Sequence, residues 1–495
     1  MRRVLSVVIA LSATGVTLAA LPGASATQIP EALQWKSCAE NPAAKAKADA
    51  APQLPALECA TLKVPLDYGD PNGRKIDIAV SRLASKAPAK RRGVLLTNPG
   101  GPGISGLTYP AILAASGLPQ EVRDSYDIIG FDPRGIGRST PVSCGLTQKQ
   151  QDRGNLPSYA HTAGDVVREA NRARQIASRC ADSKSASLLP HIGTANTARD
   201  MDRIRVALGE RRLSYMGTSY GTHLGAAYAS MFPARGDRIV LDSNLGPGGY
   251  DVRAMRLFGP GLEKRFPDFA KYVASHPEYG LGKTPRQVRA TYFKLARRLE
   301  KKPVEGVDGM AFRGLTFDRL YADASMPALA KSWQALNSGR PLPAEPPYPG
   351  VEQIMSARFA VICGDTTWPR TIREYQRNVA IDRKRYPMLG GSSANITPCA
   401  YWPGEWVKKP VRISDHGPSN VLMVQNERDP GTPLAGARQM RRALGKRAVM
   451  VTADQGGHGA YPFGRNTCAN SAVTQYLTSG QRPARDLACA AEPAN

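Results

Sequence analysis

The chain has 495 residues, of which 42% are hydrophobic and 22% are charged. This balance excludes a disordered, collagen-like or coiled-coil protein and allows a large buried core. A net charge of +25 is explained by a basic solvated surface, and it also permits contact with anionic cell-envelope polymers. No basic segment is interleaved with aromatic residues for base stacking, so nucleic acid is not expected as a partner.

The N-terminal segment, residues 1–26, is typical of a secretory signal peptide. Two arginines precede an apolar stretch over Val4–Leu21, and Ala24-Ser25-Ala26 provides small residues for cleavage. A membrane anchor is the rival interpretation, but polar residues interrupt the stretch and Pro22-Gly23 follows it. We therefore expect a secreted, extracellular protein whose mature chain has no integral membrane segment.

The eight cysteines form an even set, as in exported proteins with structural disulfides. Their spacing favours pairing between neighbours, because short loops close with the smallest loss of entropy, although other connectivities remain open. The expected pairs are Cys38 with Cys59, Cys144 with Cys180, Cys363 with Cys399, and Cys468 with Cys489. The chain has no C-x-x-C motif and only six histidines, so we expect no metal and no cofactor.

In the first half of the chain, short apolar runs alternate with helical patterns. We expect buried strands over 93–97, 126–131, 213–216 and 238–242, and a helix over 197–208. Because strands that alternate with helices form parallel sheets, the pattern predicts an α/β fold with a mostly parallel sheet.

From about residue 246 to residue 398 the pattern changes to basic helical stretches and a proline-rich segment. Strands then return over 420–425 and 448–452, with a helix over 433–444 between them. An insertion into a continuous sheet explains this order. We therefore divide the chain into a signal peptide (1–26), a first core part (27–245), an inserted, mainly helical cap (246–398) and a C-terminal core part (399–495).

A G-x-S-x-G pentapeptide, Gly217-Thr218-Ser219-Tyr220-Gly221, lies directly between a predicted strand and a helix. At such a turn a serine has a strained backbone, and the flanking glycines avoid collision with the neighbouring strand and helix. An ordinary Gly/Ser turn is the alternative. The context between a strand and a helix favours Ser219 as a catalytic nucleophile.

A serine hydroxyl becomes nucleophilic when an imidazole accepts its proton and a carboxylate orients that imidazole. We predict that the carboxylate is Asp429, which lies in the loop after the first strand that follows the cap. Glu427 and Asp454 are its rivals. We predict that the base is His458, because glycines on both sides allow its loop to approach the serine, whereas the other five histidines lack this setting.

Acyl transfer also requires N–H donors for the developing oxyanion. The loop Asn98-Pro99-Gly100-Gly101-Pro102-Gly103 follows a predicted strand and is rich in glycine. We expect one donor to be the amide of Tyr220 and the other to be that of Gly100 or Gly101, since Pro102 has no N–H. A plain turn, the alternative, would need fewer glycines.

Five segments together carry a family resemblance: NPGGPG (98–103), GFDPRGIGRS (130–139), GTSYG (217–221), ERDPGTP (427–433) and GGHG (456–459). They make the chain similar to the secreted bacterial tripeptidyl aminopeptidases, which are α/β-hydrolases related to proline iminopeptidases. The similarity covers nearly the whole mature chain, including the cysteine couples. It implies Ser219, Asp429 and His458 as a triad, an oxyanion site at Gly100-Gly101 and Tyr220, and peptide substrates cleaved near free N-termini.

An exopeptidase of this kind must bind the substrate ammonium with a carboxylate on the cap side of the cleft. The resemblance implies an acid immediately before Cys363, where this chain has Ile362. Asp365 and Asp242 are therefore the substrate-binding candidates. Either of them could instead be a capping or structural residue.

Two other functions stay open on the sequence alone. An esterase or amidase for small or natural-product substrates would share the catalytic residues and lack the ammonium-binding acid. A catalytically silent, basic protein that binds the cell envelope would use only the scaffold, but the intact Ser219, Asp429 and His458 argue against it. The sequence favours a secreted serine hydrolase that releases short peptides through an acyl-enzyme, and the family resemblance implies tripeptides.

Overall fold

A ten-stranded sheet forms the centre of the molecule, in the order β1-β2-β3-β5-β4-β6-β7-β8-β9-β10. The computed structural model describes residues 32–38, 54–151, 156–343 and 349–493, and the predicted signal peptide lies outside these ranges. The neighbours among β1, β2, β3 and β5 pair antiparallel, and all pairs from β5 to β10 are parallel. The strands are β1 (Lys36–Ser37), β2 (Glu58–Pro65), β3 (Lys75–Leu83), β4 (Gly93–Asn98), β5 (Tyr126–Phe131), β6 (Leu213–Thr218), β7 (Gly236–Asp242), β8 (Val421–Arg428), β9 (Ala448–Gly456) and β10 (Leu487–Cys489).

The sheet confirms the predicted α/β fold. Each of the six expected apolar runs forms a strand, and these strands, β4 to β9, are buried on both faces over most of their length. Buried parallel strands have continuous apolar sequences, which is why the runs were recognisable. Strands β2 and β3, which form an antiparallel hairpin, and the three-residue β10 were not expected from the sequence.

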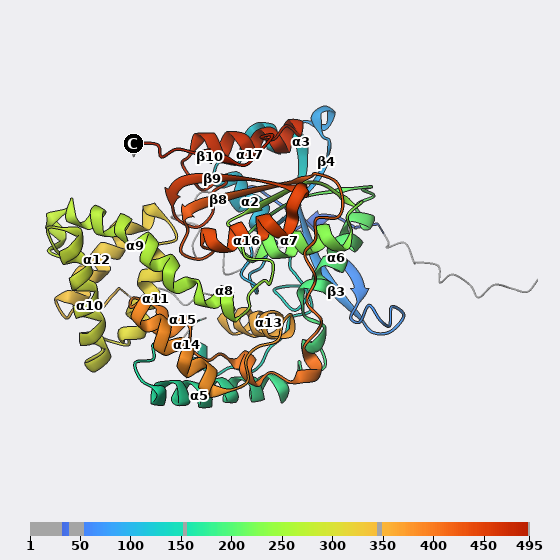
Figure 1. Cartoon of the computed structure of the whole chain (residues 1–495). Coiled ribbons are helices and arrows are strands. Elements are labelled where there is room, and N and C mark those ends of the chain that lie inside the picture. Colours follow the sequence, from blue (N-terminus) through green and yellow to red (C-terminus); the bar gives the residue numbers. More distant parts are fainter. Residues whose placement is uncertain (1–31, 39–53, 152–155, 344–348, 494–495) are drawn as a thin grey trace, which may run out of the picture.

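Helices cover both faces of the sheet (Figure 1). One face is covered by α2 (Tyr109–Ala115), α3 (Gln120–Ser125) and α17 (Thr467–Ser479). The other face is covered by α6 (Thr194–Ala207), α7 (Tyr220–Met231) and α16 (Leu434–Leu444). Each layer has its own buried apolar cluster, and burial of these side chains is the main driving force for this part of the fold.

The chain between β7 and β8 is mainly helical, and its first long helices lie to one side of the sheet in Figure 1. Its helices are α8 (Val252–Arg256), α9 (Phe258–Ala274), α10 (Pro285–Lys301), α11 (Gly309–Arg319), α12 (Met326–Asn337), α13 (Val351–Gly364), α14 (Ile372–Arg385) and α15 (Gly390–Ser393). Aromatic rings from α9, α10 and α11 meet around the buried Trp333 of α12. These rings belong to the same buried apolar cluster as the α7 face of the sheet, so the insertion packs onto the core.

One helix from outside the insertion packs against it. Helix α5 (Ala163–Ala181) lies in the first core part predicted from the sequence, yet α5 contacts α14 and the short helix Pro398–Tyr401. Val166 and Ala170 on its apolar face join Tyr375 and Val379 in a separate buried cluster. The helical layer beside the sheet is therefore built from two separate stretches of the chain.

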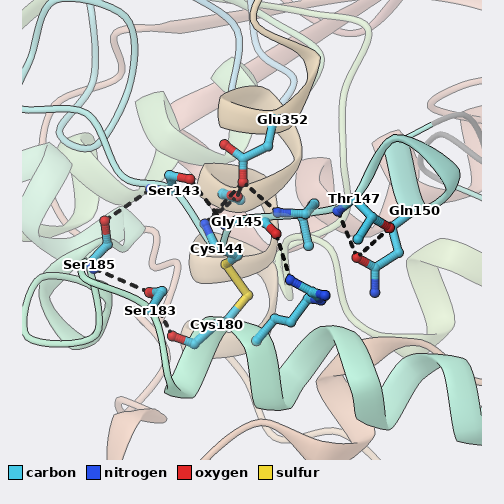
Figure 2. Close-up of a disulfide and its surroundings, with 12 residues drawn as sticks. Ser143, Cys144, Gly145, Thr147, Gln150, Cys180, Ser183, Ser185 and Glu352 are labelled. Atoms are coloured by element: carbon cyan, nitrogen blue, oxygen red, sulfur yellow. Dashed lines mark hydrogen bonds between the residues drawn. A yellow bond between two sulfur atoms is a disulfide. The ribbon is translucent and has the colours of Figure 1, made fainter.

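Helix α13 ties the insertion to the core, as Figure 2 shows around the Cys144–Cys180 disulfide. The carboxylate of Glu352 accepts N–H bonds from Cys144 (3.1 Å) and Leu146 (3.2 Å). The side chain of Gln353 accepts the N–H of Gly137 at 3.0 Å. These contacts fix the helix, and the side chains that it carries, relative to the sheet.

All four expected cysteine couples are joined in the structure: Cys38–Cys59, Cys144–Cys180, Cys363–Cys399 and Cys468–Cys489. Cys363 lies at the end of α13 and Cys399 lies in the short helix after α15, so this bond closes the last part of the insertion on itself. Among the helices that the structure describes, none is long and apolar enough to cross a membrane.

Candidate active site

Ser219 occupies a sharp turn between β6 and α7. Its φ of 60° and ψ of −124° are unusual for a residue with a side chain, and its N–H donates to the carbonyl of Asp242 at 3.0 Å. Such strain persists only where surrounding contacts hold it, and it is concentrated at functional sites. Only 8% of the residue is exposed, at the wall of a cavity. The turn therefore has the backbone geometry expected of a nucleophile.

The glycines around this turn are required by close backbone approach. A Cβ atom at position 217 would lie 2.4 Å from the carbonyl oxygen of Gly221. A Cβ atom at position 100 would lie 2.4 Å from the carbonyl oxygen of Thr218 and 2.9 Å from the Cβ of Ser219. The loop that contains Gly100 can therefore reach the serine only because this residue lacks a side chain.

Asp429 and His458 form a hydrogen-bonded pair. The Nδ1 atom of His458 lies 3.0 Å from both carboxylate oxygens of Asp429, whose side chain is fully buried. The carboxylate also accepts the N–H groups of Gly431 (2.8 Å) and Thr432 (2.9 Å) and the hydroxyl of Thr432 (2.9 Å). The structure thus brings together the acid and the base that the sequence predicts, in the orientation needed to hold an imidazole.

Electrostatics favour a proton on His458. Burial by itself lowers the pKa of this imidazole, but the charges of Asp429 and Asp242 outweigh it and raise the pKa above the ordinary value of 6.5. The ring of Tyr321 lies 4.7 Å from the imidazole between centroids, and its carbonyl accepts the N–H of His458 at 2.7 Å. The insertion therefore touches the histidine directly through Tyr321, a residue not singled out from the sequence.

Asp242 supports the histidine loop and does not face the cavity. Its carboxylate is fully buried and accepts the N–H groups of Ala460 (2.8 Å) and Tyr461 (3.0 Å), just after His458. Burial raises its pKa to about 6. The proposal that Asp242 binds a substrate ammonium is therefore wrong, because both of its oxygens already accept backbone amides inside the core.

The two rival acids lie outside this arrangement. Asp454 forms an ion pair with Arg428 at the surface and is about half exposed. Glu427 lies near the end of β8 and is half-buried, and neither rival has a recorded contact with His458 within the described ranges. The geometry of the histidine therefore favours Asp429.

The structure distinguishes between Gly100 and Gly101, the two residues that the sequence left open as the second oxyanion donor. The N–H of Gly100 donates to the side chain of Asn98 at 2.9 Å, so it is already engaged. For the N–H groups of Gly101 and Tyr220, the described part of the chain offers no recorded acceptor. Gly101 lines the same cavity as Ser219. The geometry thus favours Gly101 and Tyr220 as the pair of donors and assigns Gly100 to loop packing.

A cavity of about 780 Å³ joins these groups; we call it the Ser219 cavity. Ser219, His458 and the loop with Gly101 form its core side. Residues from the insertion form its other wall, namely Tyr250, Phe258, Asp308, Met310, Phe317, Asp318, Tyr321, Ile354 and Arg358. The walls combine apolar side chains with polar and charged groups, as a site for a small ligand or a short peptide does.

Asp318 is the acid of this cavity whose carboxylate is free. It lies near the end of α11, and the described residues provide it with no hydrogen bond or ion pair. The residue keeps contact with solvent, and desolvation by the surrounding protein raises the pKa of its carboxyl to about 6. By contrast, the carboxylate of Asp308 accepts the N–H of Ala311 (2.8 Å) and caps the start of the same helix.

Asp365 does not belong to the Ser219 cavity, which corrects its assignment as an ammonium site. It lies at the end of α13, where its carboxylate accepts the N–H of Thr194 at 2.9 Å and also the hydroxyl of that residue. It lines a second cavity, of about 480 Å³, that contains neither Ser219 nor His458. Asp365 therefore caps the start of α6, and burial raises its pKa to about 6.

No group of three or more His, Cys, Asp or Glu side chains suited to a metal ion occurs within the described ranges. The residues that line the Ser219 cavity include one histidine and two aspartates, and His458 is already engaged with Asp429. The chemistry of the site is therefore best understood from its own side chains.

Comparison with known proteins places these features in one family. Residues 386–489 match a family model described as TAP-like protein. The chain is 34% identical to a tripeptidyl aminopeptidase of Streptomyces lividans, over 88% of this chain and 84% of that protein. It is 29% identical to the serine protease Hip1 of Mycobacterium tuberculosis, over 92% and 91% of the two chains. It is also 32% identical to a carboxylesterase B of that organism, over 96% of each.

A strand-turn-helix serine, a buried aspartate paired with a histidine and a predominantly parallel sheet are shared requirements of one enzyme class. The similarity to the Streptomyces protein extends over most of both chains, so it covers the core and the insertion together. This chain therefore belongs to the tripeptidyl aminopeptidase family of α/β-hydrolases and is a serine hydrolase.

Proposed function

We propose that the protein is a secreted serine peptidase that releases short peptides, tripeptides above all, from substrates with a free N-terminus. Ser219 is the nucleophile, His458 is the general base and acid, and Asp429 orients the imidazole. The N–H groups of Gly101 and Tyr220 bind the oxyanion. The Gly100 side of the loop, with its N–H held by Asn98, supports this pair.

The proposed reaction has two stages. His458 accepts the proton of the Ser219 hydroxyl while the oxygen attacks the scissile carbonyl, and it then gives that proton to the leaving amine. Water next attacks the acyl-enzyme with the same imidazole as base, and the peptide leaves with a new carboxylate. Donors that face the oxyanion stabilise the transition state more than the bound substrate, which is what raises the rate.

The observation that carries the peptidase proposal is the free carboxylate of Asp318 in the Ser219 cavity. A substrate ammonium that enters this cavity loses part of its hydration, and pairing with Asp318 compensates for that loss. Asp318 and Ser219 line the same cavity of about 780 Å³, a volume suited to a small ligand or a short peptide. This arrangement favours cleavage a short distance from the N-terminus.

An esterase remains the second candidate, because one relative with high coverage is named carboxylesterase B. The catalytic groups would be the same for an ester. The two candidates differ in whether the cavity recognises an ammonium. The family resemblance implies an acid at position 362, where this chain has Ile362. An aminopeptidase therefore requires Asp318 in that role, whereas an esterase requires no acid there.

Export is part of the proposal. Four disulfides within the described ranges are typical of proteins from an oxidising compartment. The charged start, apolar stretch and small-residue cleavage motif of residues 1–26 supply the signal for it. We also propose residues 246–398 as the functional cap and anionic cell-envelope polymers as a contact for the basic surface.

The test uses a peptide library in free and N-acetylated forms, with the products identified by mass spectrometry. We expect the free peptides to be cleaved after the third residue and the acetylated ones far more slowly. Asp318→Asn should raise KM for the free peptides and leave a small neutral ester nearly unaffected, because only the ammonium contact is lost. Asp308→Asn is the matched control on the same helix. Equal cleavage of free and acetylated peptides would favour the esterase.

A further inference from the structure

Arg358 is a buried cation that lacks an anionic partner. It lies on α13 and faces the Ser219 cavity, with only 6% of the residue exposed. Its Nη1 atom donates to the carbonyl of Gly101 at 2.8 Å, and its guanidinium lies 4.9 Å from the ring centre of Tyr250. No carboxylate within the described ranges forms an ion pair with it. A buried charge without a counter-ion is costly, so its place in a ligand cavity calls for an explanation.

Each of the other buried arginines of the described chain has either an anionic partner or several acceptors. Arg134, Arg265 and Arg313 each form an ion pair with an aspartate or a glutamate. Arg447 has no such pair, but it donates to three backbone carbonyls and to the side chain of Asn420. Arg358 has one recorded acceptor, and its remaining nitrogens are not sealed in by protein. These nitrogens are available to a ligand in the cavity.

The position of this guanidinium indicates which anion it meets. It holds the carbonyl of Gly101, the residue whose N–H is proposed to bind the oxyanion next to Ser219. Hydrolysis of the acyl-enzyme breaks the bond between the carbonyl carbon and the serine oxygen and forms a bond to a water oxygen. The serine regains its proton through His458, one proton is released, and a full negative charge appears on the new carboxylate of the peptide.

We propose that Arg358 binds the C-terminal carboxylate of the released peptide, so that short peptides with both termini free are retained in the Ser219 cavity and inhibit the enzyme. The inference rests on the proposed function, which supplies the peptide and the ammonium contact at Asp318. Arginine is suited to this task, because its planar guanidinium donates two parallel hydrogen bonds to a carboxylate. The zwitterionic product then contacts Asp318 with its ammonium and Arg358 with its carboxylate.

The test measures binding to full-length protein that carries Ser219→Ala, so that no peptide is turned over. Isothermal titration calorimetry compares trialanine, trialanine amide and N-acetyl-trialanine. We expect trialanine to bind about tenfold or more tightly than its amide, as the loss of a charge-assisted contact implies. Adding Arg358→Gln should abolish this carboxylate preference and keep the preference for a free over an acetylated N-terminus. Adding Asp318→Asn should instead abolish the preference for a free N-terminus and keep the carboxylate preference.

Lys149→Gln is the matched control, because it removes an exposed positive charge that lines the same cavity, and it should alter neither preference. Equal binding of trialanine and its amide to the Ser219→Ala protein overturns the proposal, even if Arg358→Gln does not fold. A carboxylate preference that survives in Arg358→Gln also overturns it and assigns Arg358 to support of the Gly101 loop alone. A missing ammonium preference beside an intact carboxylate preference refutes the aminopeptidase function and leaves Arg358 as the carboxylate site.

Discussion

Gly100 shows how one missing side chain decides whether the oxyanion loop can form. A Cβ atom there would lie 2.4 Å from a backbone carbonyl of the Ser219 turn, and backbone atoms cannot move aside cheaply. We expect Gly100→Ala to displace the loop and lower kcat by about 10²-fold or more, as loss of an oxyanion donor does. Steady-state kinetics on a small ester measures this.

Gly117 provides a control for backbone strain in the same experiment. Its φ of 91° is close to the 94° of Gly100, but a Cβ atom there meets nothing within 4 Å. Gly117→Ala should therefore cost about 1 kcal/mol of unfolding free energy for its left-handed backbone and leave the kinetics unchanged. If both variants lose activity equally, backbone strain and not contact with the serine turn is the cause.

Single substitutions also test which of Asp429, Glu427 and Asp454 is the acid that orients His458. Asp429→Asn should lower kcat on the order of 10⁴-fold, since the amide holds the imidazole in the wrong tautomer. Glu427→Gln should stay within about twofold of the parent, because Glu427 has no recorded contact with His458. Kinetics of both variants, with a fluorophosphonate probe to count reactive serines, compares them. An inactive Glu427→Gln variant together with an active Asp429→Asn variant would assign the triad acid to Glu427.

At the scale of elements, the end of β7 holds the loop that carries His458. Asp242 accepts two amides of this loop, and the hydroxyl of Ser243 accepts the N–H of Gly459 at 2.8 Å. Asp242→Asn turns an N–H donor toward these amides and leaves buried groups unpaired. This lowers the free energy of unfolding by about 1–3 kcal/mol. We expect a lower Tm and a lower kcat with KM little changed.

The matched control for this change is Asp251→Asn. Asp251 also accepts two backbone amides, those of Arg253 and Ala254, but it caps α8 away from the histidine. It should change Tm only slightly and should not change kcat. Thermal unfolding and ester kinetics on both proteins separate support of the loop from general stability. A normal kcat in Asp242→Asn would contradict the role of β7.

At the scale of the whole molecule, the pH dependence of peptide cleavage depends on His458 from the core and on Asp318 from the insertion. His458 must be neutral to accept the serine proton, and its pKa is raised, so activity on every substrate should rise with pH through that value. A free peptide additionally needs an ionised Asp318, whose pKa is about 6, while its own α-ammonium stays charged in this range. The ratio of peptide to ester kcat/KM should therefore fall as the pH drops through about 6.

The Asp318→Asn variant is the check on this pH profile. Its peptide-to-ester ratio should be low and independent of pH between about 5 and 7, because no carboxylate remains to titrate at the ammonium. Asp242 and Asp365 also have pKa values of about 6, but they do not line the Ser219 cavity, so their titration affects both substrates alike. An unchanged slope in Asp318→Asn would show that another group binds the ammonium.

The sequence by itself determined the elements whose signals are local. Buried parallel strands are continuous apolar runs, and the turn around Ser219 needs small residues at fixed offsets from the serine, so both could be read from short windows. Asp429 and His458 were placed by the strands that precede them, because loops after parallel strands meet at one edge of the sheet. Loop lengths favoured pairing between neighbouring cysteines and left other connectivities open.

Only the tertiary structure decided how the cavity is lined. Asp365 lies near Cys363 in the chain, yet the packing of α13 turns it toward Thr194, whereas Asp318 and Arg358 come from cap helices whose sequences carry no motif. The two candidate donors in the glycine-rich loop were likewise separated by a side-chain contact from Asn98. The physical reason is that a backbone turn is specified by its own residues, while the direction of a helical side chain into a shared cavity depends on packing between segments that lie far apart in the chain.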